Sequence, residues 1–127
     1  MAGADGNHDQ AAAAARFDWG LAGLRHLAAG VDVVVIVDVL RFTTAVTVAV
    51  ERGAEVVPHP WAGEQAAPLA ADLGAELAGR REDGGWSLSP TDLQRLSVGT
   101  RLLLPSPDGG ALAAAAGALG ARRVLAG

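Results

Sequence analysis

The chain has 127 residues, of which 50% are hydrophobic and 4% aromatic, and its formal net charge is −4. All of its basic residues are arginines and it has no cysteine, which excludes Schiff-base and P-loop lysines, disulfides, thiolate nucleophiles and cysteine-bound zinc. Because there is no basic block, no secretion signal and no apolar run of bilayer length, we expect one soluble, cytoplasmic domain without nucleic-acid or membrane partners.

The N-terminal stretch carries little structural signal. Residues 1–15 are expected to be disordered or weakly helical, because they begin with a polar, glycine-rich segment and their alanine run has little to bury. The α/β domain is expected to span residues 16–127. We expect Phe17 and Trp19 to anchor its first segment to the main body. A short helix is then predicted from the spacing of Leu21, Leu24 and Leu27.

The most informative stretch is residues 31–54. Residues 33–37 are apolar without interruption and rich in valine, which predicts a buried strand rather than an edge strand. A helix that ends at Gly53 should follow, with one apolar face of Phe42, Ala45, Val46 and Ala49. A second face should carry Thr43, Thr47 and Glu51. Asp38 and Arg41 lie between strand and helix, where ligands bind in open α/β sheets.

Two interpretations of this corner stand side by side. In the first, Asp38 binds Mg²⁺ or attacks phosphorus, and Arg41 holds phosphate oxygens at the start of the helix. In the second, the two residues form a structural ion pair, or Asp38 caps the helix. Thr43 and Thr44 could likewise donate hydrogen bonds to an anion or be ordinary capping residues.

A second strand is predicted over residues 54–58, where prolines should end it, and it would complete a right-handed βαβ unit with the first strand. Residues 61–73 predict a helix with a kink or a late start at Pro68, followed by a brief strand at residues 75–78. His59 should lie at the same sheet edge as the first corner. It could serve there as an acid or base, or be an ordinary loop residue.

A further helix start is marked by Ser89, Pro90 and Asp92, which combine an N-cap serine, a proline at the first position and an early acid. This helix should run to about Leu96. Residues 100–104 then predict an apolar strand.

The loop of residues 106–110 follows that strand and precedes a helix predicted over residues 111–119. A strand, a small glycine-bearing loop and a helix can cradle phosphate with free backbone N–H groups. An ordinary turn with Asp108 as the N-cap is the alternative. A final strand is predicted over residues 122–125, and because the chain stops there, we expect a longer α/β domain that has been cut.

Three segments, in this order, resemble the 2-phosphosulfolactate phosphatase family, the Mg²⁺-dependent phosphatases associated with coenzyme M synthesis. They are VDVLRFTTAVTVAVERGAEVVP, WSLSPTDL and LLLPSPDGGALAAA, and the resemblance covers roughly Val31 to Ala126. The chain departs from the family pattern in its loops. Arg80 stands where the family often has an acid, while Leu88 and Asp108 stand where it has asparagines.

The resemblance implies a three-layer α/β/α sandwich with a mostly parallel sheet, Mg²⁺ as cofactor, and hydrolysis of the phosphate monoester of a small 2-hydroxy acid such as 2-phosphosulfolactate. It implies that Asp38 is the metal ligand or the nucleophile, and that Arg41 and Arg81 hold the phosphate or the acid groups of the substrate. The expected substrate-binding residues are completed by Thr43, Thr44, Ser89, Ser106, Asp108 and Gly109.

Members of this family are roughly twice as long as this chain. Further strands and part of the site would then lie in a missing C-terminal half, and a homodimer is a further expectation for the partner. The alternative to a phosphatase is a catalytically inactive fragment or degenerate paralogue, which keeps the fold and binds an anion or a partner chain.

Overall fold

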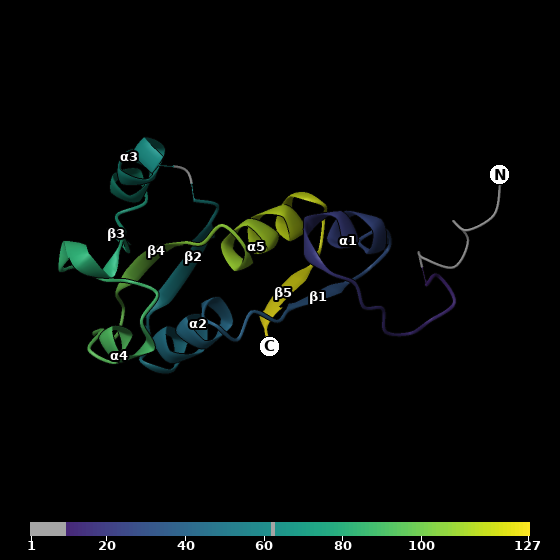
Figure 1. Ribbon diagram of the computed structural model, residues 1–127, viewed down its shortest axis with the longest axis horizontal. Helices are drawn as coiled ribbons and strands as arrows, with labels where there is room; N and C mark the ends of the chain where they lie inside the picture. The colour runs from purple at the N-terminus through teal and green to yellow at the C-terminus, as the bar shows by residue number, and fades with distance from the viewer. Residues whose placement is uncertain (1–9, 62) are drawn as a thin grey trace.

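The computed structural model describes residues 10–61 and 63–127 (Figure 1). The helices in these ranges are α1 (Gly20–Leu27), α2 (Phe42–Glu51), α3 (Ala66–Asp72), α4 (Pro90–Leu93) and α5 (Gly109–Ala118), with 3-10 turns η2 (Gly63–Gln65) and η3 (Arg81–Asp83). The strands are β1 (Val33–Ile36), β2 (Glu55–His59), β3 (Glu76–Leu77), β4 (Arg101–Pro105) and β5 (Arg123–Ala126). Their pairings are all parallel, which confirms the predicted mixed α/β class.

These strands form two separate sheets. In the larger sheet β4 lies between β2 and β3, with Glu55 beside Arg101 and His59 beside Pro105. The smaller sheet consists of β1 and β5, and Figure 1 shows it apart from the larger one. The three-layer sandwich expected for the whole domain therefore stays a prediction.

The core is built on β4, whose side chains alternate between the two faces of the larger sheet. Leu102 and Leu104 pack in one cluster with Ala45 of α2 and Leu93 of α4. Leu103 points to the opposite face and packs against α3. All three β4 leucines are 0% exposed. Helices thus cover both faces of this sheet, and β4 is its best-buried strand.

Helix α2 forms where the apolar spacing predicts it, and Phe42, Ala45 and Ala49 are buried on its inner face. The chain leaves the helix through Gly53, whose φ is +80°. A Cβ atom at this position would lie 3.1 Å from the Val98 side chain. Glycine is therefore required here by both the backbone conformation and the close approach of Val98.

The prediction that residues 33–37 form a buried central strand is wrong. Within the described chain β1 has β5 as its only partner, and Val33 and Val35 are 41% and 55% exposed. Only Val34 and Ile36, on the other face, join the core. The predicted βαβ unit is also wrong, because β1 and β2 lie in different sheets. A run of valines indicates a strand, but it does not determine how many other strands and helices will cover that strand.

Predictions near the N-terminus have mixed outcomes. Residues 1–9 lie outside the described part of the chain, and residues 10–15 form turns without a helix. The helix predicted from three leucines is α1. Phe17 and Trp19 do not anchor the segment: they are 64% and 78% exposed and contact each other, with ring centroids 5.1 Å apart.

The remaining boundaries shift by a few residues. Helix α3 begins late, as expected, and Pro68 is its third residue, where a backbone N–H has no helical acceptor to lose. Strand β2 runs through Pro58, past its predicted end. Helix α4 starts at Pro90 as predicted but ends at Leu93. No helix in the described ranges is long and apolar enough to cross a bilayer.

Candidate functional site

The corner between β1 and α2 is held by reciprocal hydrogen bonds. The Thr43 N–H donates to the Asp38 carbonyl at 2.9 Å, and the Asp38 N–H donates to Thr43 Oγ1 at 3.2 Å. Thr44 Oγ1 donates to the Val39 carbonyl at 2.7 Å. These bonds fix the backbone of Asp38 relative to the first turn of α2.

Thr43 is only 1% exposed, whereas Thr47 and Glu51, predicted on the same face of the helix, are exposed. The Thr43 hydroxyl oxygen stabilises the corner by accepting the Asp38 N–H. A ligand could contact that hydroxyl only if the corner changed conformation and exposed it. Thr44 is half-buried, and its hydroxyl proton is already used in the bond to Val39. The two threonines therefore serve the corner itself, and their binding to a substrate stays a prediction.

Among the described residues, the side chains of Asp38 and Arg41 have no polar partner. Neither takes part in a salt bridge or a side-chain hydrogen bond within the described residues, so the structural ion pair considered above is absent. Arg41, not Asp38, occupies the N-cap position, and the cap has no side-chain hydrogen bond. Asp38 is half-buried and Arg41 is exposed. A carboxylate and a guanidinium are thus both available at this corner.

The loop after β4 is tied to the end of β2. The Ser106 N–H donates to the His59 carbonyl at 2.9 Å, and the Ala111 N–H donates to the Ser106 carbonyl at 3.1 Å. Ser106 itself is 3% exposed. Asp108 is exposed at the N-cap position of α5, where its side chain makes no capping bond. Asp108 therefore occupies the N-cap position without the side-chain hydrogen bond that a capping residue normally makes.

The two glycines that begin α5 bring this loop to the first corner. A Cβ atom on Gly109 would clash with the Phe42 side chain, and one on Gly110 would clash with the His59 carbonyl. Both glycines are buried, and their N–H groups make no hydrogen bond within the described structure. The first residues of α2 and α5 are consequently in contact. Helix N-termini carry free N–H groups and the positive end of the helix dipole, which attract anions.

His59 adds one feature that the sequence did not reveal. It lies at the carboxyl end of β2, half-buried, and its Nε2 atom is buried without a hydrogen-bond partner among the described residues. The expectation that His59 shares a sheet edge with Asp38 is wrong, because β2 and β1 lie in different sheets. No local sequence pattern indicates that Nε2 is buried.

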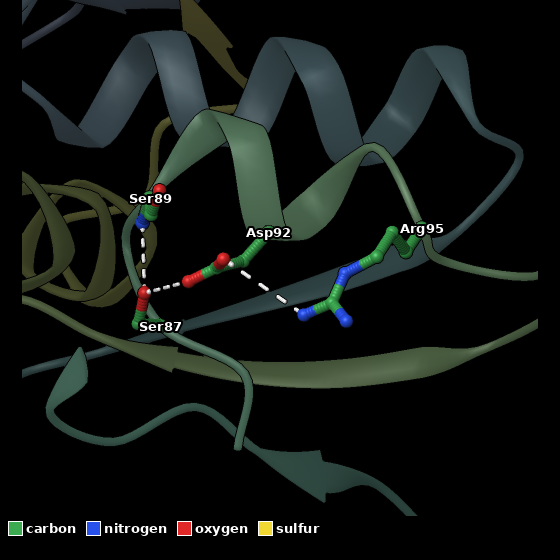
Figure 2. Close-up of polar contacts among 4 residues, drawn as sticks. All are labelled: Ser87, Ser89, Asp92 and Arg95. Atoms are coloured by element: carbon green, nitrogen blue, oxygen red, sulfur yellow. Dashed lines mark hydrogen bonds and ion pairs between the residues drawn. The ribbon is translucent and has the colours of Figure 1, made fainter. Parts of the chain in front are cut away.

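Ser89 belongs to a local network at the start of α4 (Figure 2). Its N–H donates to Ser87 Oγ at 3.1 Å, and Ser87 Oγ donates to Asp92 Oδ2 at 2.8 Å. Arg95 lies 3.8 Å from Asp92 Oδ1. Ser89 is 6% exposed. These contacts order the start of α4, and none of them reaches the corner at Asp38.

Arg81 is exposed in η3, and no hydrogen bond or salt bridge among the described residues links its side chain to the corner. Close to Arg81 is a cavity of about 140 Å³ at the carboxyl ends of β3 and β4. Its walls include Trp61, Ala66, Leu77, Arg80, Asp83 and Pro105. None of the residues predicted to bind substrate lines it.

Comparisons with models of known protein families, with curated proteins and with solved structures found no match. In the part of the chain that the structure describes, no group of three or more histidine or acidic side chains is arranged to hold a metal ion. The candidate site is thus defined by its own geometry: the N-termini of α2 and α5, with Asp38 and Arg41 beside them.

Proposed function

We propose that the protein is a Mg²⁺-dependent phosphatase that hydrolyses the phosphate monoester of a small 2-hydroxy acid such as 2-phosphosulfolactate. The observation that supports this proposal is the contact between the first residues of α2 and α5, made through Phe42 and Gly109. It brings together two helix N-termini and the N–H groups of Gly109 and Gly110, which make no hydrogen bond within the described residues. The carboxylate of Asp38, which has no salt-bridge partner among those residues, lies next to the start of α2.

Each group has a role in this proposal. The backbone N–H groups at the start of α5 bind phosphate oxygens, and the Arg41 guanidinium adds paired hydrogen bonds to the same group. Asp38 holds the metal ion or attacks phosphorus, and water supplies the oxygen that replaces the alcohol. The bonds from Thr43 keep the Asp38 backbone in place while this happens.

The residues at this corner could bind Mg²⁺ only together with water molecules and the substrate as further ligands. It is commonly held by one or two carboxylates, with waters and substrate phosphate oxygens as the other ligands. Asp38 is the carboxylate that would hold it here, since its oxygens have no partner among the described residues. When bound, the ion would neutralise the negative charge of the phosphate oxygens.

The test is phosphate release from 2-phosphosulfolactate, phospholactate and an aryl phosphate, with and without Mg²⁺. Asp38→Asn should lower kcat by on the order of 100-fold, because the substitution removes the charge that binds the metal or attacks phosphorus. Asp32→Asn is the matched control. Asp32 lies just before β1, at its opposite end, where its carboxylate pairs with Arg122 at 3.4 Å.

Equal rates in the Asp38→Asn and Asp32→Asn variants would refute the role given to Asp38. Absence of Mg²⁺-dependent turnover of all three substrates would refute the phosphatase proposal itself.

A second candidate is a non-catalytic protein that keeps the fold and binds a partner chain, including a second copy of itself. The observation that favours it is an apolar face on the small sheet, formed by Val33, Val35, Val37 and Leu125, which are 41%, 55%, 66% and 49% exposed. Sheets with open edges and apolar faces readily pair with other chains. Light scattering should then show a dimer that Val35→Glu converts to a monomer. A monomeric wild-type protein would exclude the homodimer.

A further inference from the structure

The cavity beside β3 is a second candidate ligand site. We propose that it binds a small organic acid, whose ring-sized apolar part occupies the cavity and whose acid group pairs with Arg80. None of its lining residues belongs to the corner at Asp38 and Arg41. The inference therefore stands without the phosphatase proposal.

Three chain segments build this cavity. Leu77 and Ala78 come from the carboxyl end of β3, Pro105 from the end of β4, and Trp61 from the connection between β2 and α3. In open α/β sheets, ligands bind in crevices outside the carboxyl ends of the strands. The cavity thus occupies a position in the fold where a ligand is expected, and its lining residue Pro105 directly precedes the loop that begins at Ser106.

Its size and walls favour a ring over a bare anion. The volume of about 140 Å³ is close to that of an apolar cavity of about 150 Å³ that holds benzene. Leu77, Ala66 and Pro105 provide apolar surface, and Trp61, 46% exposed, provides an indole ring. Inorganic phosphate would leave most of this apolar surface without a contact.

The rim of the cavity carries one guanidinium, that of Arg80, and one carboxylate, that of Asp83. Asp83 is engaged in the η3 turn: its Oδ2 accepts from the Arg80 N–H at 3.3 Å, and its N–H donates to the Arg80 carbonyl at 3.1 Å. Arg80 makes no salt bridge within the described ranges. A guanidinium forms paired hydrogen bonds with a carboxylate, so Arg80 can hold the acid group of a ligand at the rim.

Benzoate is the probe, and benzyl alcohol is its uncharged counterpart. The three tryptophans give three indole N–H signals in a ¹⁵N-labelled sample, and Trp61→Phe assigns the relevant one. Titration of the full chain with benzoate should shift the Trp61 signal with a Kd on the order of 1 mM, typical of a ligand this small. Arg80→Gln should weaken binding about tenfold, the effect of one lost charged hydrogen bond.

Arg52→Gln is the matched control, because Arg52 is an exposed arginine at the end of α2 that does not line the cavity. It should leave the affinity unchanged, and the dispersion of the amide spectrum shows whether each variant is folded. Equal effects of the two arginine substitutions would overturn the proposal. So would benzyl alcohol binding as tightly as benzoate, or benzoate shifting the signals of Trp19 and Trp86 while that of Trp61 stays in place.

Discussion

Thr43→Val tests whether the corner before α2 depends on one buried hydroxyl. Valine has nearly the same shape as threonine, so the substitution removes the Oγ1 atom that accepts the Asp38 N–H at 3.2 Å while keeping the packing of the 1%-exposed side chain. The Asp38 N–H then has no acceptor in the described structure. The backbone bond from the Thr43 N–H to the Asp38 carbonyl, at 2.9 Å, remains.

The expected cost follows from that unpaired donor. Leaving a buried polar group without its partner costs about 1–3 kcal/mol, and the part-buried setting of this bond places the cost near the lower end. We expect the free energy of unfolding to fall by about 1–1.5 kcal/mol. With a urea m-value of about 1.5–2 kcal/mol/M, the midpoint should fall by roughly 0.5–1 M at an unchanged m-value.

Urea unfolding followed by circular dichroism measures this difference, with Thr47→Val as the control. Thr47 lies one turn later in α2 and is exposed, and its Oγ1 donates to the Thr43 carbonyl at 2.9 Å. Its loss leaves no buried group unpaired, so the midpoint should move by less than about 0.3 M, a surface-substitution effect. Equal midpoints for the two variants would show that the hydroxyl of Thr43 does not hold the corner.

Two further predictions use the same unfolding assay. Gly110→Ala should destabilise the protein by about 2 kcal/mol or more, because its Cβ meets the backbone carbonyl of His59. Gly117→Ala is the control, because Gly117 lies in the same helix with open space at its Cβ position, and it should stabilise the protein by about 0.5–1 kcal/mol. A Gly110→Ala variant that is more stable than the Gly117→Ala variant would contradict the packing described for α5. Leu104→Ala should lower the free energy of unfolding by about 2–5 kcal/mol, because Leu104 is 0% exposed. Leu40→Ala, at a position that is 89% exposed, should change it by less than about 0.5 kcal/mol.

Local features of the chain could be read from the sequence alone. The inner face of α2, its end at Gly53 and the start of α4 at Pro90 follow from side-chain spacing, a glycine at a positive φ and a proline in the first turn. Each can be predicted from residues a few positions apart, although the contact of Gly53 with Val98 is an additional, tertiary reason for that glycine. The same holds for the late start of α3 and for the mixed α/β class.

Features that depend on distant segments were decided by the tertiary structure. The number of strands beside β1, the burial of Thr43 and the contact between Phe42 and Gly109 all involve partners that no local period specifies. The cavity beside Arg80 likewise needs three segments to meet. The sequence determined that Asp38 and Arg41 follow a strand and precede a helix. Only packing decided that both side chains have no ion-pair partner among the described residues and that a second helix N-terminus lies against the first.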